Sequence, residues 1–416
     1  MSPTSRGYSA QLSETLAGIP LQMLFTVEAM RWLGIVATLA ITALVAAMLT
    51  TSLHAQSRKP FARCGEPVVG GAPNWSPDGK DIAYWGVTSK KPFVSSIWRV
   101  RSDGTHRQRM AQFSQGVSPY FPVWSPDGQT IAFGNAQHEV FTVPAAGGTP
   151  QFLTNGDQPG WFPDGKQLVV LRMPPPGNPY LRASFGVVTE AGEDVRSFYT
   201  RAGEQWSATP NVSPDGTSIV YGAWHDGRGG SLRIIGADGS NDHWLDPNIE
   251  GSFPLYGEFP RWSPDGSTIA FTNVDVEGDF DAVHTYIQVV RKNGLSVDGV
   301  ATGISPTWSP DGSRIAFVHR DGDGSARSGQ IWIADRNGNA LHPIAPGCAF
   351  GTGHADRITP GVQARAVYAF GGNDLIRARD GRREYIDCGR GRDRVVADAR
   401  DVVTSTCEVV TRRRRT

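Results

Sequence analysis

The sequence has no excess of charge of either sign, because 40 lysine and arginine residues are balanced by 40 aspartate and glutamate residues. A balanced chain lacks the overall field that would draw it onto nucleic acid or acidic membrane surfaces. Charged residues are also scarce, at 19% of the chain, whereas there are 49 glycines and 29 prolines. This composition predicts an all-β protein of short strands joined by tight turns, with no nucleic-acid partner.

Long apolar runs are absent except for one, which extends from Leu33 to Leu49. This run predicts an export signal over residues 30–55, with cleavage after Ala55. Its length approaches the roughly 20 residues of a spanning helix, so a retained N-terminal membrane anchor is the alternative. Residues 1–29 lack a basic segment suited to such a signal and are expected to be a non-translated or disordered extension. The protein is therefore expected in the periplasm, at the cell surface or outside the cell.

Cysteine is rare, with four residues, and there is no Cys-x-x-Cys pair of the kind found in structural zinc sites. An even number of cysteines in an exported chain predicts disulfide bonds. Cys64 and Cys348 bracket the repeat region described next, so a bond between them would join its first and last parts. Cys388 and Cys407 are expected to pair with each other across the C-terminal repeats.

A five-residue motif occurs six times, at spacings of 37 to 51 residues, and a proline precedes each copy by two positions. The copies are Trp75-Ser-Pro-Asp-Gly79, Trp124-Ser-Pro-Asp-Gly128, Trp161-Phe-Pro-Asp-Gly165, Val212-Ser-Pro-Asp-Gly216, Trp262-Ser-Pro-Asp-Gly266 and Trp308-Ser-Pro-Asp-Gly312. Proline fixes the second turn position and glycine takes the left-handed conformation, so each copy predicts a strand, a turn and a strand. A second hairpin follows in every repeat, which predicts six four-stranded blades of a β-propeller.

The extended pattern Pro-x-Trp-Ser-Pro-Asp-Gly-x-x-Ile-Ala-Phe resembles the repeat of the TolB-like and WD-like β-propellers. The resemblance implies the fold but no single function, since similar blades occur in periplasmic scaffold proteins, in peptidase propellers and in polysaccharide lyases. No segment between Ala55 and Cys64 could hold the α/β domain of TolB. The Gly-x-Ser-x-Gly elbow of the peptidases is also missing from the sequence.

Two functional interpretations follow from the propeller. The first is a non-catalytic, monomeric scaffold that binds a protein or a cell-envelope polymer and touches membrane only through the N-terminal anchor. The second is a carbohydrate-active enzyme, a lyase or glycosidase that would use the propeller channel. The motif aspartates and tryptophans are better explained by turn formation and packing between blades, and the histidines follow no motif, so no catalytic residue is assigned.

The partner is expected on the end of the propeller that carries the long connections. Antiparallel pairing puts both turns of a blade at one end and the variable connections at the other. Aromatic and acidic residues in these connections suit partner recognition, whereas packing in the channel mouth is the alternative for the aromatic ones. The candidate binding residues are Tyr120, Phe121, Trp206, Phe253, Tyr256, Phe259, Asp275, Glu277, Asp279 and Asp281.

The C-terminal part carries an acidic-x-aliphatic unit every eight to ten residues. Gly389-Arg-Gly391-Arg-Asp393-Arg-Val395 resembles the core of the calcium-binding (RTX-type) β-roll, although arginines occupy its turns. The resemblance implies calcium held by Asp374, Asp393 and Asp401. The alternative is a stack of rungs that binds no cofactor and is cross-linked by the disulfide between Cys388 and Cys407. The expected order is a linker (56–65), the propeller (66–347), a connector (348–370), the β-roll-like segment (371–410) and a basic tail (411–416).

Overall fold

Strands make up all the regular structure in the part of the chain that the computed structural model describes. The described residues are 64, 68–90, 93–112, 118–173, 183–199, 204–225, 229–245, 256–277, 282–294, 297–319, 329–360 and 364–412. They belong to one unit, Arg63–Thr416. Within these ranges no helix has the length and apolar character needed to cross a membrane. The predicted signal or anchor, residues 30–55, lies outside the described residues.

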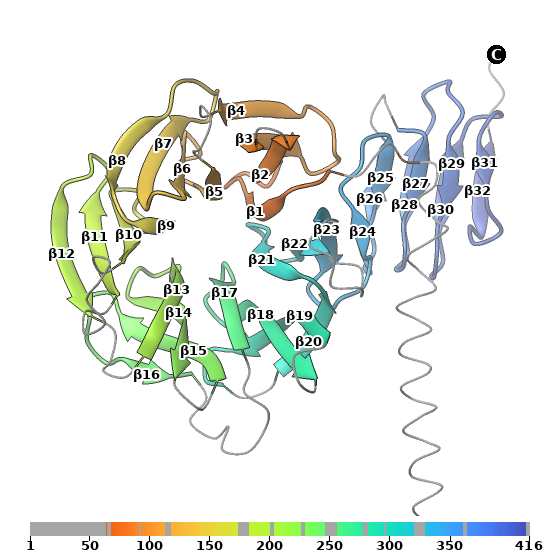
Figure 1. Ribbon diagram of the computed structural model, residues 1–416. Coiled ribbons are helices and arrows are strands. Elements are labelled where there is room, and N and C mark those ends of the chain that lie inside the picture. The colour runs from red at the N-terminus through yellow and green to blue at the C-terminus, as the bar shows by residue number, and fades with distance from the viewer. Residues whose placement is uncertain are drawn as a thin grey trace, which may run out of the picture. The chain divides into compact units, whose positions relative to one another are not determined.

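Six four-stranded antiparallel sheets follow one another along the chain and form the blades of a propeller, as predicted (Figure 1). Blades 1 and 2 contain β1 (Gly71–Trp75), β2 (Asp81–Lys90), β3 (Phe93–Arg101), β4 (Gln108–Gln112), β5 (Pro119–Trp124), β6 (Thr130–Asn135), β7 (Glu139–Pro144) and β8 (Gln151–Asn155). Blades 3 and 4 contain β9 (Asp157–Trp161), β10 (Gln167–Arg172), β11 (Ser184–Thr189), β12 (Asp194–Tyr199), β13 (Glu204–Val212), β14 (Ser218–His225), β15 (Gly229–Gly236) and β16 (His243–Trp244). Blades 5 and 6 contain β17 (Tyr256–Trp262), β18 (Thr268–Glu277), β19 (Ala282–Arg291), β20 (Val297–Thr302), β21 (Ile304–Trp308), β22 (Arg314–His319), β23 (Gln330–Asp335) and β24 (His342–Pro343).

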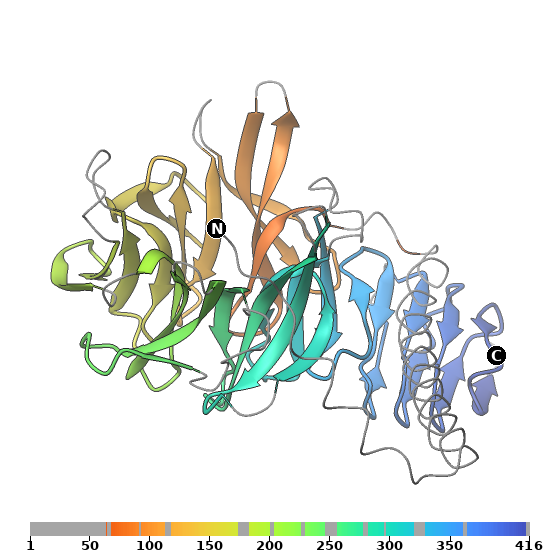
Figure 2. The same cartoon turned by 60° about the horizontal axis from the view of Figure 1, so that its bottom comes forward.

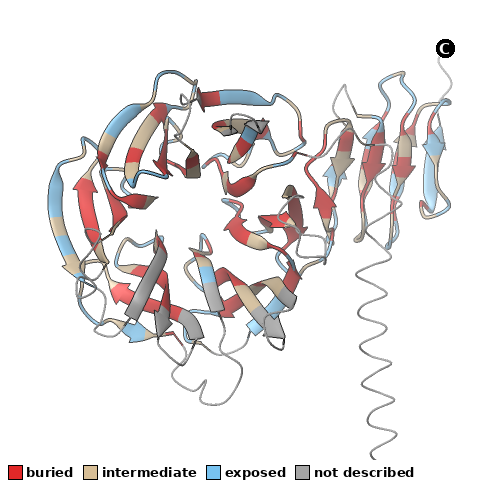
Figure 3. Ribbon diagram, viewed as in Figure 1, coloured by how far each residue is buried: buried red, intermediate tan, exposed pale blue. Residues whose placement is uncertain are grey.

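The core lies between neighbouring blades, where the second strands are almost fully buried (Figure 3). Alternation along each second strand directs aliphatic side chains into this core, and Ile82, Ile131 and Ile219 have no exposed surface. Trp124 packs with Ile97 of the preceding blade and with Ile131 of its own blade in one apolar cluster. The repeated tryptophan is therefore a core residue between blades, as the sequence favoured.

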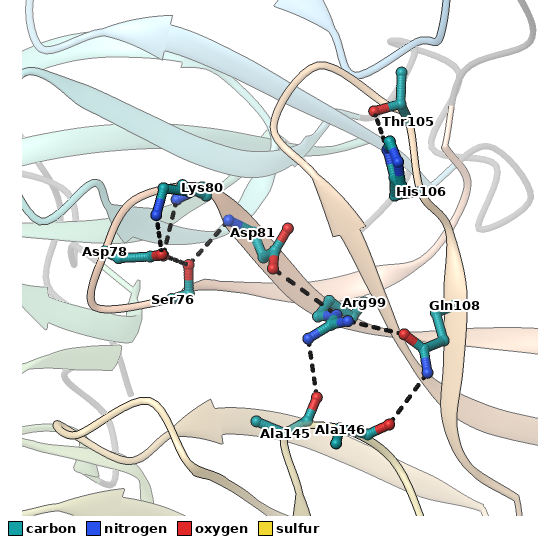
Figure 4. A network of polar contacts seen from close by, with 10 residues as sticks. All are labelled: Ser76, Asp78, Lys80, Asp81, Arg99, Thr105, His106, Gln108, Ala145 and Ala146. Atoms are coloured by element: carbon teal, nitrogen blue, oxygen red, sulfur yellow. Dashed lines mark hydrogen bonds and ion pairs between the residues drawn. The ribbon is translucent and has the colours of Figure 1, made fainter.

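The Ser-Pro-Asp-Gly motif forms the turn between the first and second strands. In blade 1 the Ser76 hydroxyl donates to Asp78 Oδ1 at 2.7 Å, and the Lys80 backbone N–H donates to the same oxygen at 3.1 Å (Figure 4). Hydrogen bonds from the Lys80 and Ser76 side chains lower the pKa of Asp78 to about 2. The motif aspartates thus hold their own turns, which is the role that the sequence indicated.

The ring closes in two ways at the seam between blades 6 and 1. A disulfide bond joins Cys64 to Cys348, as predicted. The backbone N–H of Gly70 also donates to the Gly329 carbonyl at 2.7 Å, and the N–H of Ile331 donates to Val68 at 2.8 Å. Residues 68–70 therefore pair with blade 6 ahead of β1, so backbone hydrogen bonds accompany the covalent closure.

A β-solenoid of stacked parallel rungs follows the propeller. One sheet has the order β25 (Cys348–Phe350), β27 (Ala366–Tyr368), β29 (Tyr385–Asp387) and β31 (Val402–Val403). The other has the order β26 (Arg357–Ile358), β28 (Leu375–Ala378), β30 (Arg394–Ala397) and β32 (Val409–Arg412). In each predicted acidic-x-aliphatic unit the acid comes directly before a strand, and successive units alternate between the two sheets. The predicted bond between Cys388 and Cys407 links neighbouring rungs.

The solenoid begins earlier than the expected segment 371–410. Residues 348–370, expected to be a connector, contain β25, β26 and β27, and β25 pairs in parallel with β27. The reason is visible in Asp356-Arg-Ile358, an acidic-x-aliphatic unit whose backbone N–H at Asp356 donates to Asp374 Oδ1 at 2.8 Å. At the other end, β32 extends into the expected basic tail as far as Arg412.

Candidate partner-binding face

The propeller has two different ends, which are named here the turn face and the loop face. The turn face carries the Ser-Pro-Asp-Gly turns and the second turns, such as Asp103-Gly104. The loop face carries the connections between second and third strands and the passages from one blade to the next. Figure 2 shows the hairpin of β2 and β3, in orange, projecting from the ring. Antiparallel pairing in every blade fixes this division, because consecutive connections must alternate between ends.

The first strand of every blade contains a β-bulge at the same motif position, three residues before the motif tryptophan or valine. The residues at this position all have a positive φ between 45° and 57°. They are Ala72, Phe121, Gln158, Thr209, Phe259 and Ser305. A left-handed conformation is uncommon for residues other than glycine, and unusual for bulky ones. The inner strands around the channel therefore carry a ring of six bulges. Each bulge sets the direction of the side chain at its position.

Phe121 and Phe259 are the two aromatic residues of this ring, and they contact each other. Their ring centroids are 5.5 Å apart, although Phe121 belongs to blade 2 and Phe259 to blade 5. Tyr120 packs edge-on against Phe121 at 5.1 Å between centroids. All three side chains are half-buried. The structure thus brings three of the predicted binding residues together in a cluster that spans the channel.

A polar cluster adjoins Tyr120 on the loop face. The Tyr120 hydroxyl donates to the Asn135 carbonyl at 2.6 Å and to Asp157 Oδ2 at 3.0 Å. His138 Nδ1 lies 3.0 Å from the same carboxylate oxygen. Burial raises the pKa of Asp157, while the bonds from His138 and Tyr120 oppose that rise. Burial and the adjacent carboxylate also raise the pKa of the Tyr120 hydroxyl.

This Tyr120–His138–Asp157 cluster was not anticipated from the sequence. His138 has a positive φ of 59° in the β6–β7 turn, whereas Asp157 is the first residue of β9 in the next blade. The cluster therefore ties the loop-face turn of blade 2 to the inner strand of blade 3. No repeated motif position marks either residue, and their proximity arises only from the packing of two blades.

For the other candidate binding residues, the structure gives the strand for some and does not describe the rest. Trp206 lies in β13 and Tyr256 in β17, both inner strands. Asp275 and Glu277 lie in β18, which continues into the connection between the second and third strands of blade 5 and pairs with β19. That connection is thus an extended hairpin and not the open loop that was expected. Phe253, Asp279 and Asp281 lie outside the described residues.

The three calcium candidates are buried between the rungs of the solenoid. Oδ1 of Asp374 accepts the backbone N–H of Asp356, and Oδ1 of Asp393 accepts that of Asp374, each at 2.8 Å. Oδ1 of Asp401 accepts the backbone N–H of Glu384 at 3.0 Å. Each acid therefore bonds to the backbone of the preceding rung. Burial raises the pKa of Asp374 to about 7.

Among the described residues, no group of three or more His, Cys, Asp or Glu side chains is arranged to hold a metal ion. The calcium site implied by the sequence resemblance and the alternative stack without a cofactor predict different results. Because the acids already accept backbone N–H groups, we expect the rungs to stack equally well with 5 mM calcium or with excess EDTA. Thermal unfolding in the two buffers measures this, with magnesium as the control for ionic strength. A calcium-specific rise in the melting temperature, lost in Asp393→Asn, would instead assign a calcium site to these residues.

Comparison with known proteins supports the fold. No protein-family model matches the chain. An uncharacterized protein of Agrobacterium fabrum is 26% identical over 213 residues, which are 50% of this chain and 66% of that protein. The crystal structure of TolB from Acinetobacter baumannii superimposes with a TM-score of 0.50 and 17% identity, over 62% of each chain. The chain therefore spans slightly less than two thirds of the length of either protein.

The fold of the propeller, with six four-stranded blades, is thus similar to that of the TolB propeller. A structure of oligogalacturonate lyase from Vibrio parahaemolyticus is also similar, with a TM-score of 0.43 and 13% identity over 70% of this chain and 80% of that one. The finer WD-like and RTX-type relationships stay resemblances in sequence.

Proposed function

We propose that the protein is an exported, non-catalytic β-propeller that binds a protein or a cell-envelope polymer at the channel mouth on its loop face. The observation that carries this proposal is the Phe121–Phe259 pair with Tyr120 beside it. The other four blades have small or polar residues at the equivalent bulge position. The backbone geometry of the bulge therefore does not itself require an aromatic side chain.

Half-buried aromatic side chains on a rigid scaffold suit binding. Each ring keeps exposed surface while its backbone is held by a bulge and a four-stranded sheet, so little conformational freedom is lost when a partner covers it. The bulge geometry is uncommon, and such backbone strain persists where the surrounding structure fixes it. Two disulfide bonds support the exported location, since such bonds persist in oxidising compartments.

Replacing Phe121 or Phe259 by alanine is expected to reduce partner capture at least tenfold while the fold is retained. The physical reason is the loss of an aromatic contact surface at the centre of the binding site. The purified propeller, immobilised, would be exposed to envelope extract and to isolated cell-wall polymer, and the bound material quantified for each variant. Thermal unfolding of the same variants measures stability.

The matched control is Phe152→Ala. Phe152 is a phenylalanine on β8 that is 55% exposed and lies in the outermost strand of blade 2, away from the channel. It should leave capture unchanged. If Phe121→Ala and Phe259→Ala lower stability and leave capture intact, the aromatic pair only packs the channel, and the proposed binding face is wrong.

A further inference from the structure

A cavity of about 720 Å³ lies on the turn face, at the seam that closes the ring. Three segments line it: residues 101–106 of blade 1, residues 311–314 of blade 6, and residues 347–359 in the first rung of the solenoid. Its size falls within the range of small-molecule sites in proteins. It is separate from the loop face, so an inference about it is independent of the function proposed above.

The carboxylates around the cavity are already engaged in their own turns. Asp103 Oδ1 accepts the Thr105 backbone N–H at 2.9 Å and its hydroxyl at 2.6 Å. Asp311 Oδ1 accepts the Ser309 hydroxyl at 2.6 Å, and it also accepts the Ser313 N–H. Asp356 Oδ2 accepts the Thr352 N–H and hydroxyl, at 2.6 and 2.9 Å. These acids therefore shape the walls of the cavity.

In the described part of the chain the arginines around the cavity donate no hydrogen bond to these carboxylates, although the positive charge of Arg314 acts on Asp311. Arg101, Arg314 and Arg357 all line it, and none forms an ion pair within the part of the chain that the structure describes. The Arg314 guanidinium is held 5.0 Å above the centre of the Trp75 ring, across the seam between blades 6 and 1. Guanidinium groups bind carboxylate and phosphate through two parallel hydrogen bonds. Because its position on Trp75 is fixed, the Arg314 guanidinium can bind an anion in the cavity with little loss of conformational freedom.

Apolar side chains complete the walls. Phe350 and Ile358 of the first rung line the cavity, and Cys348 beside them is bonded to Cys64. Gly104, with a φ of 82°, allows the blade 1 turn to approach the chain entering the solenoid, since a β-carbon there would lie 2.4 Å from the Ala345 carbonyl carbon. The propeller and the solenoid thus meet through a close backbone contact and a covalent bond, and together they supply the walls.

We propose that this seam cavity binds a small organic anion, whose carboxylate or phosphate group pairs with Arg314 and Arg357 while its carbon skeleton lies against Phe350 and Ile358. The two arginines favour a negatively charged ligand. The apolar wall favours an organic anion over an inorganic one. The inference rests on one juxtaposition: in this cavity the acids accept hydrogen bonds within their own turns, whereas the arginines form no ion pair with any described residue.

The test is to titrate the full chain with three sugars of similar size. Calorimetry measures binding directly, and the shift in melting temperature measures it independently. Glucuronate presents a carboxylate, glucose 6-phosphate presents a phosphate, and glucose presents neither. We expect at least one of the two anions to bind and to bind at least tenfold more tightly than glucose. Binding should weaken as salt is raised, since screening reduces the attraction of the arginines. Whichever anion binds identifies the acidic group that the site accepts.

Arg314→Gln and Arg357→Gln should each weaken anion binding about tenfold, the usual effect of losing a charge-assisted hydrogen bond. Arg377→Gln is the matched control, because Arg377 is an exposed arginine of β28 in the next rung and does not line the cavity. Arg357 is also exposed, so its variant should fold normally even if Arg314→Gln disturbs the packing on Trp75. Equal binding of all three sugars, no binding of either anion, or an Arg377→Gln effect as large as that of Arg357→Gln would overturn the proposal.

Discussion

Replacing both Cys64 and Cys348 by serine is expected to lower the free energy of unfolding by about 5 kcal/mol. The disulfide closes a loop with a sequence separation of 284 residues, and the entropy it removes from the unfolded chain grows with the length of that loop. The hydrogen bonds of Val68 and Gly70 to blade 6 remain in the variant, so the ring should still close but should open more easily. Denaturant unfolding of both proteins under oxidising conditions measures the difference.

The second disulfide provides the control for this experiment. Cys388 and Cys407 have a sequence separation of only 19, for which the same chain-entropy model gives about 3 kcal/mol. Replacing this pair by serine should therefore cost less and should act mainly on the solenoid. Cys348 and Cys388 are both buried, so the cost of burying serine enters both variants. If the double variant at Cys64 and Cys348 unfolds at the same denaturant concentration as the native protein, the seam disulfide does not hold the ring.

The blades could be predicted from the sequence because the determinants of each blade are local. Proline, aspartate and glycine in a fixed order specify a turn, and the aliphatic residues after the turn alternate with the period of a strand. The same reasoning located the C-terminal rungs, but it placed their start too late. The first rung has Asp356-Arg-Ile358 without the Gly-x-Gly-x-Asp spacing, and its pairing with the next rung appears only in three dimensions.

The candidate site was only partly predictable. The sequence selected Tyr120, Phe121 and Phe259 by their position in the connections between blades. Their contact, however, depends on the β-bulge in each inner strand. No residue type predicts these bulges, since the bulge positions hold residues as different as Ala72 and Phe121. Asp157 and His138 come from different blades and share no motif position. The cavity at the seam needed knowledge of how blade 1, blade 6 and the first rung meet. Local patterns thus specify blades, whereas sites between blades arise from how the blades pack.

The junction of propeller and solenoid is expected to weaken in acid, because it contains a buried histidine. His342, in the outermost strand of blade 6, is 4% exposed. Its ring stacks on Phe350 of the first rung, with 3.9 Å between ring centroids, and lies 5.8 Å from that of Phe370. Burial lowers the pKa of His342 from 6.5 to about 3, and the nearby Arg314 guanidinium also opposes a positive charge there. The folded protein therefore keeps this ring neutral.

The pH dependence follows from linkage. Below pH 6.5 the unfolded chain binds a proton at His342, whereas the folded protein does not until pH approaches 3, so stability is present above pH 6.5 and is lost as pH falls. A shift of this size corresponds to about 4 kcal/mol lost between pH 6.5 and pH 3. Denaturant unfolding at several pH values, followed by the near-ultraviolet signal of the aromatic residues, measures the loss.

His342→Phe isolates this contribution, because phenylalanine keeps the stack on Phe350 and cannot bind a proton. The variant loses the contact of Nδ1 with the Pro343 carbonyl, 3.2 Å away, which lowers stability equally at every pH. Its stability should therefore fall less steeply than that of the native protein between pH 6.5 and pH 3, with the difference approaching 4 kcal/mol. His243→Phe is the matched control, since His243 is exposed on β16 and its ring meets water in the folded protein. Parallel pH profiles for the native protein and His342→Phe would show that acid acts on other groups, and that the buried histidine does not limit the stability of the junction.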